Sequence, residues 1–121
     1  MYRFAAMATA LVLTGVGLAL LFAPNVQLAL LGLEPDAGGA FMGRWSSPAF
    51  LALAGLIWGG RREPAGPMRR NICLGYGTMF VFFAVLGVKD LLGGVVSPAH
   101  LAAIAIEGVL AAALLLSIRR R

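Results

Sequence analysis

The sequence predicts an all-α fold, an integral membrane four-helix transmembrane bundle. The composition is the first reason, because 60% of the 121 residues are hydrophobic and only 12% are charged. Soluble domains carry about 25% charged residues. The second reason is that four apolar stretches, at 4–22, 40–60, 68–88 and 98–118, each approach the ~20 residues that a helix needs to cross a bilayer. We therefore expect a single transmembrane domain, 1–121, in contact with the lipid bilayer.

The first stretch, 4–22, follows a short basic start like that of a secretory signal. Its apolar run is long for a signal and no clear cleavage site follows, so we expect a retained helix. Pro24 and Asn25 break this span. The segment "VQLALLGL" that follows predicts a short helix lying in the membrane interface, and Gly32 and Pro35 would end it.

Helix-breaking residues also separate the later stretches. Pro64, Gly66 and Pro67 lie between 40–60 and 68–88. Before the fourth stretch, we expect Ser97 to be the N-cap and Pro98 the first helical residue. Small residues at four-residue spacing let helix backbones approach closely, either inside the bundle or between two copies. The second stretch and the residue before it carry four of them, Gly39, Gly43, Gly55 and Gly59.

The basic residues predict the orientation. Eight of the ten fall on one side of a four-span bundle, namely Arg3, Arg61, Arg62, Arg69, Arg70, Arg119, Arg120 and Arg121. The other side holds only Arg44 and Lys89. The positive-inside rule then places both termini and the middle loop in the cytoplasm, as expected of a multi-pass protein of a bacterial inner membrane. This topology also explains the net charge of +5, so we predict no nucleic-acid partner.

Glu107 is the unusual residue of the fourth stretch, because it lies about 15 Å from the start of that stretch, near the bilayer midplane. An ionised carboxylate there costs about 3 kcal/mol or more unless it is paired or hydrated. Ala103 and Ala111 share its face, so we expect it to point into the bundle. Arg44, about 7 Å deep on the second helix, is within reach of Glu107, and so is His100, two turns before it. This predicted cluster is a structural ion pair, a ligand or proton site, or a contact for a partner helix.

The remaining candidates carry little chemistry. Lys89 and Asp90 are expected to be solvated charges at the outer end of the third helix. The lone Cys73 excludes an internal disulfide and is expected to fill the core. No second His or Cys lies at ligand spacing from His100, so we predict no metal and no cofactor. No phosphate loop, nucleophile elbow or triad is present, so we predict no catalytic residue and a non-catalytic protein.

These features together resemble an uncharacterised family of small bacterial four-helix membrane proteins, known only as a domain of unknown function. The resemblance rests on Pro24, "LLGL" at 30–33, Arg44, a Gly-containing helix that ends at Arg61, and "SPxxLxxxxxE" from Ser97 to Glu107. A looser likeness is to DoxX-like proteins. The resemblance implies the four-helix fold and the pairing of Arg44 with Glu107, and it implies no activity.

Three functions fit these observations. An accessory or stabilising subunit of a larger membrane complex, or a homo-oligomer, needs nothing that the sequence lacks, because the loops are short and no extramembrane domain is present. The alternatives are a small proton-coupled transporter that uses Glu107, and a lipid- or quinone-binding membrane protein with a pocket of Arg44, His100 and Glu107.

Overall fold

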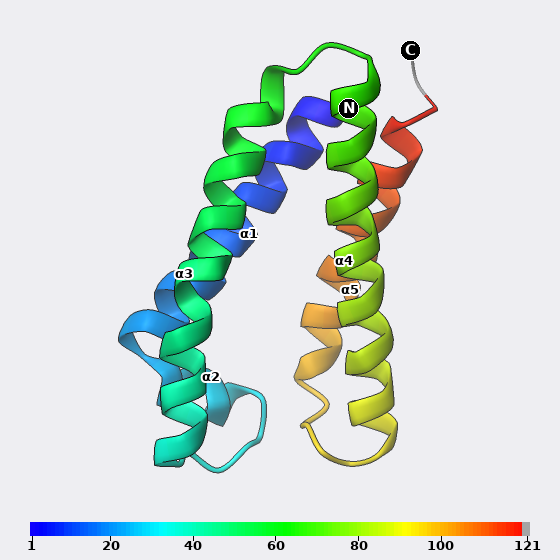
Figure 1. The fold of residues 1–121 in the computed structure, drawn as a ribbon. Coiled ribbons are helices and arrows are strands. Elements are labelled where there is room, and N and C mark those ends of the chain that lie inside the picture. Colours follow the sequence, from blue (N-terminus) through cyan, green and yellow to red (C-terminus); the bar gives the residue numbers. More distant parts are fainter. Residues whose placement is uncertain (120–121) are drawn as a thin grey trace.

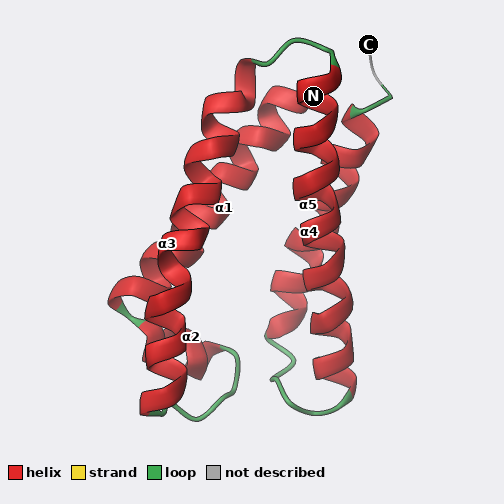
Figure 2. Ribbon diagram, viewed as in Figure 1, coloured by secondary structure: helices red, strands yellow, loops and turns green. Residues whose placement is uncertain are grey.

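The computed structural model describes residues 1–119, and within them only helices, turns and short connections occur. The elements are α1 (Tyr2–Phe22), α2 (Pro24–Leu30), α3 (Ala37–Gly59), the short 3-10 helix η1 (Gly60–Arg62), α4 (Pro67–Leu92) and α5 (His100–Ser117) (Figure 2). The predicted all-α fold is confirmed, and a long helix covers each of the four apolar stretches. Arg120 and Arg121, two of the eight arginines that predict the orientation, lie outside the described residues.

The short helix after the first span is also present, as α2. Pro24 occupies the first position of α2, where its missing N–H costs nothing and its fixed φ suits a helix. α3 begins before residue 40 because the Asp36 carboxylate accepts a hydrogen bond from the Gly39 N–H and caps the helix. α4 continues beyond residue 88, so Lys89 and Asp90 lie in its last turn.

Three of the described helices are long and apolar enough to cross a membrane, namely α1, α4 and α5. α3 has 23 residues and is long enough, but it is not one of the three. Its apolar run is interrupted by Arg44, by the two serines that follow Trp45, and by Pro48. Over the length of a membrane span, α3 is therefore less apolar than α1, α4 and α5.

The long helices form two pairs, with α1 packed against α3 and α4 packed against α5. Figure 1 shows the two pairs converging at the end that holds the N-terminus and the connection between α3 and α4, and diverging toward α2. We call the converging end, residues 1–3, 60–66 and 118–119, the basic end. The core contains Leu13, Ile57, Phe80 and Leu114, and Cys73 fills space among them with no exposed surface.

Tyr2 connects the two pairs at the basic end. Its hydroxyl donates a hydrogen bond of 2.8 Å to the Gly60 carbonyl at the end of α3. The Arg69 guanidinium, from α4, lies 4.6 Å from the centre of the Tyr2 ring. Arg69 also donates a hydrogen bond of 3.2 Å to the Ser117 carbonyl of α5. One aromatic side chain thereby joins α1 and η1 to α4 and, through Arg69, to α5.

The opposite end is held by a contact between two loops. The Ser97 N–H donates a hydrogen bond of 2.8 Å to the Leu31 carbonyl. Gly32 has a φ of +78°, and a Cβ added there would lie 2.7 Å from the Ser97 Cβ. The expectation that Ser97 caps the last helix is therefore wrong. Ser97 is recruited by the loop after α2, and α5 begins later, at His100, after a turn in which the His100 N–H donates to the Ser97 carbonyl.

The four glycines expected to bring helices together divide into two groups. A Cβ on Gly39 would lie 3.1 Å from Leu28 of α2, and one on Gly43 would lie 3.3 Å from side chains of α1 and α2. Gly55 and Gly59 face open space, with nothing within 4 Å of an added Cβ. Close packing against another helix of the bundle, one of the two alternatives, is therefore not seen at Gly55 and Gly59.

The closest approaches between helices occur at glycines that the spacing motif did not select. On α1, a Cβ on Gly17 would lie 2.9 Å from Leu51 of α3. On α4, a Cβ on Gly77 would lie 2.7 Å from Leu115 of α5. Each helix pair thus has a glycine opposite a leucine at a close approach, and neither of these two glycines stands in a repeated small-residue motif.

We expect Gly32→Ala to destabilise the protein more than Gly94→Ala. Both glycines have positive φ, which costs an L-residue about 1–2 kcal/mol. Only at Gly32 would the new methyl group also meet the Ser97 backbone and side chain, because nothing lies within 4 Å of a Cβ on Gly94. Unfolding in mixed detergent, followed by circular dichroism, measures both variants. Equal losses would contradict the loop–loop contact.

Candidate functional site

The polar residues of α5 lie on the face that packs against α4. His100 and Glu107 are two turns apart, about 10 Å along the helix. A Cβ added at Gly87 of α4 would lie 2.9 Å from the His100 Nε2 atom, so His100 sits against α4. Further along, Leu115 sits against Gly77. Glu107 lies between these two contact levels and is half-buried, which agrees with the expectation that it points into the bundle.

Both residues carry a buried polar atom without a partner. Glu107 Oε2 and His100 Nδ1 are inaccessible to solvent and make no hydrogen bond, and the same is true of Thr9 Oγ1 on α1. An unsatisfied buried polar group costs about 1–3 kcal/mol, and more when it is charged. These atoms are therefore places where a proton, a bound molecule or a polar group of another chain would be favourable.

The structure does not bring Arg44 to this cluster. No ion pair or hydrogen bond joins the Arg44 side chain to Glu107 or His100 within residues 1–119. The reason is the pairing of the helices, because α3 packs against α1 rather than against α5. The buried residues of α3 include Ala40, Ser47 and Ala54, whereas Arg44 is exposed. The expected ion pair between α3 and α5 is therefore absent.

Arg44 instead lies on an outward patch of α3, which we call the Arg44 patch and define by Phe41, Arg44, Trp45 and Pro48. These four residues line a shallow hollow of about 520 Å³. The rings of Phe41 and Trp45 are 5.6 Å apart, and Trp45 is 72% exposed. An arginine flanked by two exposed aromatic rings, all on one face, distinguishes this patch from the apolar faces of the other helices.

A local hydrogen bond keeps α3 intact beside the Arg44 patch. Pro48 has no N–H, so the Arg44 carbonyl, one turn earlier, loses its normal helical partner. The Ser47 hydroxyl donates to that carbonyl at 2.8 Å and replaces the lost bond. Since a bare carbonyl is costly in a lipid environment, this replacement lets a proline sit inside a long helix. Serine directly before proline in an apolar stretch is a sequence signal that would have identified this role of Ser47.

The other candidates of the sequence fall at helix ends or in the core. Lys89 is exposed in the last turn of α4 and Asp90 is half-buried there. Their carbonyls accept backbone hydrogen bonds from Gly93 and Val95, which close the helix. Among residues 1–119, no three His, Cys, Asp or Glu side chains gather closely enough to hold a metal ion.

Comparison of the chain with protein-family models, with curated proteins and with solved structures gives no match. The resemblance to a family of small four-helix membrane proteins therefore stays a prediction. The chemistry of this chain has to be inferred from its own geometry, of which the His100–Glu107 face and the Arg44 patch are the two polar features along the helices.

We expect Arg44→Gln and Glu107→Gln to change stability independently. Because no ion pair joins the two residues, a double-mutant cycle should give a coupling below about 0.5 kcal/mol, the usual error for residues that do not touch. The positive control is Arg61 with Trp58, whose guanidinium lies 4.1 Å from the ring centre. A coupling of about 2 kcal/mol or more between Arg44 and Glu107 would show that they do meet.

Proposed function

We propose that this chain is a multi-pass protein of a bacterial inner membrane, with four spans and cytoplasmic termini, that acts as a non-catalytic subunit of a larger membrane assembly. The observation that carries the proposal is the outward direction of the Arg44 patch. α3 is the one long helix of the described chain that is not apolar enough to span alone, and its exposed side carries a cation without an internal partner.

The exposed charge of Arg44 makes lipid an unfavourable neighbour for this face of α3. A charged side chain on the lipid face near the middle of a span costs about 2.5–3.5 kcal/mol on insertion scales. Arg44 follows the start of α3 by seven residues, about 10 Å along the axis. A helix bundle that is complete in itself turns such a group inward. Here the small residues face α1 and the cation faces out, which favours a second protein as its neighbour.

The occupant that fits the Arg44 patch is a transmembrane helix with an acidic side chain at the level of Arg44. A guanidinium pairs with a carboxylate through two parallel hydrogen bonds, and this pair is strongest where water is excluded. Phe41 and Trp45 would cover it, as aromatic residues do at the centres of interfaces. A second copy of this chain fits less well, because a two-fold interface on this patch would place the two Arg44 side chains together.

A photo-reactive residue tests this proposal. Placed at position 45, it should yield one stoichiometric cross-linked protein in membranes, because Trp45 lies in the Arg44 patch. The matched control is position 82 on α4, where Phe82 is 64% exposed and should contact lipid. Arg44→Ala should abolish the cross-link at 45, whereas Arg70→Ala, which removes an exposed charge elsewhere, should leave it. Equal labelling from both positions, or an Arg44-independent product, would refute the proposal.

A second function is favoured by Glu107. A half-buried carboxyl with an unpartnered oxygen, on a helix that can span the membrane, is the type of group that carries protons in small transporters. The pocket of Arg44, His100 and Glu107 is not favoured in the same way, because Arg44 is on another face.

The transporter alternative makes a prediction of its own. In proteoliposomes with an imposed pH gradient, proton-coupled uptake or efflux should be lost in Glu107→Gln, because an amide cannot take up and release a proton. Folding should be unaffected, since Glu107 makes no ion pair within residues 1–119. His100→Gln, which alters the other unpartnered residue on the same face, serves as the comparison. A Glu107→Gln protein that transports as well as the unmodified chain would exclude this alternative.

A further inference from the structure

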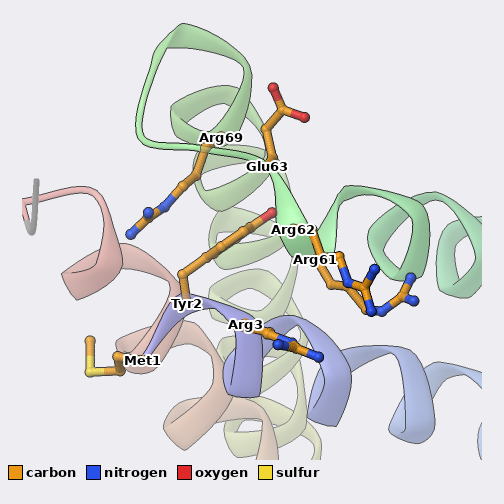
Figure 3. Close-up of a pocket in the computed structure, with 7 residues that line it drawn as sticks. All are labelled: Met1, Tyr2, Arg3, Arg61, Arg62, Glu63 and Arg69. Carbon is orange, nitrogen blue, oxygen red and sulfur yellow. The ribbon is translucent and has the colours of Figure 1, made fainter.

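The basic end contains a pocket that topology alone does not explain. It has a volume of about 380 Å³ and is lined by Met1, Tyr2, Arg3, Arg61, Arg62, Glu63 and Arg69 (Figure 3). The positive-inside rule accounts for the number of arginines on one side of a membrane. It does not account for four of them, from α1, η1 and α4, lining one pocket.

The floor of this pocket is fixed by contacts inside the chain. Tyr2 is only 4% exposed, and its hydroxyl is bound to the Gly60 carbonyl. Arg69 is held against the Tyr2 ring and against the Ser117 carbonyl. Arg61 is held in turn, since its guanidinium covers the Trp58 ring and donates to the Trp58 carbonyl at 2.6 Å. The positive charges of Arg61 and Arg69 are therefore positioned before any ligand arrives.

The pocket carries positive charge that the described chain does not neutralise. The side chains of Arg3 and Arg62 have no hydrogen-bond or ion-pair partner within residues 1–119. Figure 3 shows Arg3, Arg61 and Arg62 extending to the same side of the pocket, while Glu63 points away from them. The first turn of α1 also opens here without a side-chain cap, which adds free N–H groups and the positive end of a helix dipole. The missing partner is an anion.

An apolar hollow begins where the basic pocket ends. It lies between α3 and α4, has a volume of about 460 Å³, and shares Glu63 with the basic pocket. Its walls are mostly apolar, from Leu53, Leu56, Gly59, Gly60, Met68, Ile72 and Tyr76. A third hollow of about 260 Å³ continues from it past Gly75 to Met79. The hollows run along two diverging helices and meet the basic pocket at Glu63.

We propose that the basic pocket and the adjoining α3–α4 groove bind one anionic phospholipid. Its phosphate lies among Arg3, Arg61 and Arg62, and one acyl chain lies in the groove toward Gly75. Guanidinium groups pair with phosphate oxygens through paired hydrogen bonds, and basic pockets between transmembrane helices are suited to lipid headgroups. Met68, which lines the groove and is exposed, would lie where the headgroup and the hydrocarbon meet. The inference stands without the partner proposed for the Arg44 patch.

Lipid titration of the delipidated protein in detergent, followed by native mass spectrometry, tests the headgroup. Phosphatidylglycerol should bind at least about tenfold more tightly than phosphatidylcholine with the same acyl chains. The double variant Arg3→Gln/Arg62→Gln should lose that preference. The double variant Arg70→Gln/Arg119→Gln removes the same charge from exposed positions outside the pocket and should keep it. Unchanged selectivity in the first variant, or an equal loss in both, would overturn the proposal.

A second pair of variants tests the acyl chain and separates a lipid from free phosphate. Gly75→Leu fills the groove without an internal clash, because nothing lies within 4 Å of a Cβ there. It should weaken phosphatidylglycerol binding by several-fold, whereas Gly15→Leu, at an equally open site on α1, should not. If Gly75→Leu has no effect and inorganic phosphate displaces the lipid completely, the site takes a soluble phosphate and the lipid assignment is wrong.

Discussion

The convergence of the two helix pairs at the basic end centres on the side chain of Tyr2. Its hydroxyl donates a hydrogen bond to the Gly60 carbonyl, where the first helix pair ends. Its ring contacts the guanidinium of Arg69 from the second pair. Arg69 carries the connection on to Ser117 of α5. A buried phenol can do this because it has an apolar body for the core, an aromatic face for a cation and a hydroxyl for a carbonyl. Through Tyr2, the two pairs converge at the basic end, and toward the other end they diverge (Figure 1).

That convergence gives the two ends of the bundle different properties. At the basic end, the same contacts that join the pairs also hold the arginines at fixed positions, so positive charge is concentrated. Further along, α3 and α4 separate, and Tyr76 links them through a hydrogen bond from its hydroxyl to the Leu53 carbonyl. The space along this line is lined mostly by leucine, isoleucine, methionine and glycine, together with Tyr76 and the polar residues Glu63 and Asn71. A charged pocket that continues into an apolar groove has the distribution of polarity found in a phospholipid.

The two polar features along the helices differ in what they need. Glu107 is turned toward α4, so a partner for its buried oxygen can be a proton or a small molecule inside the bundle. Arg44 is turned outward with Phe41 and Trp45 beside it, so a partner for its positive charge has to come from outside the chain. No ion pair joins Arg44 and Glu107 within the described residues, so the partner of Arg44 and the role of Glu107 are independent. The accessory-subunit proposal depends on Arg44, and the transporter alternative depends on Glu107.

The sequence by itself determined the helices, because helix formation in an apolar chain depends on local composition and on breakers such as Pro24 and Pro67. It also identified α2, the inward direction of Glu107 and the buried Cys73, all of which follow from residues close in sequence. Only the tertiary structure decided which helices pair and which loops meet, and these two outcomes account for the predictions that are wrong. Because α3 pairs with α1, Arg44 cannot reach Glu107 and Gly55 faces open space, and because the loop after α2 meets Ser97, that serine is not a cap. Long helices can pair in several ways at similar cost, and close contacts between residues distant in sequence, such as those at Gly17, Gly77 and Tyr2, distinguish the observed pairing.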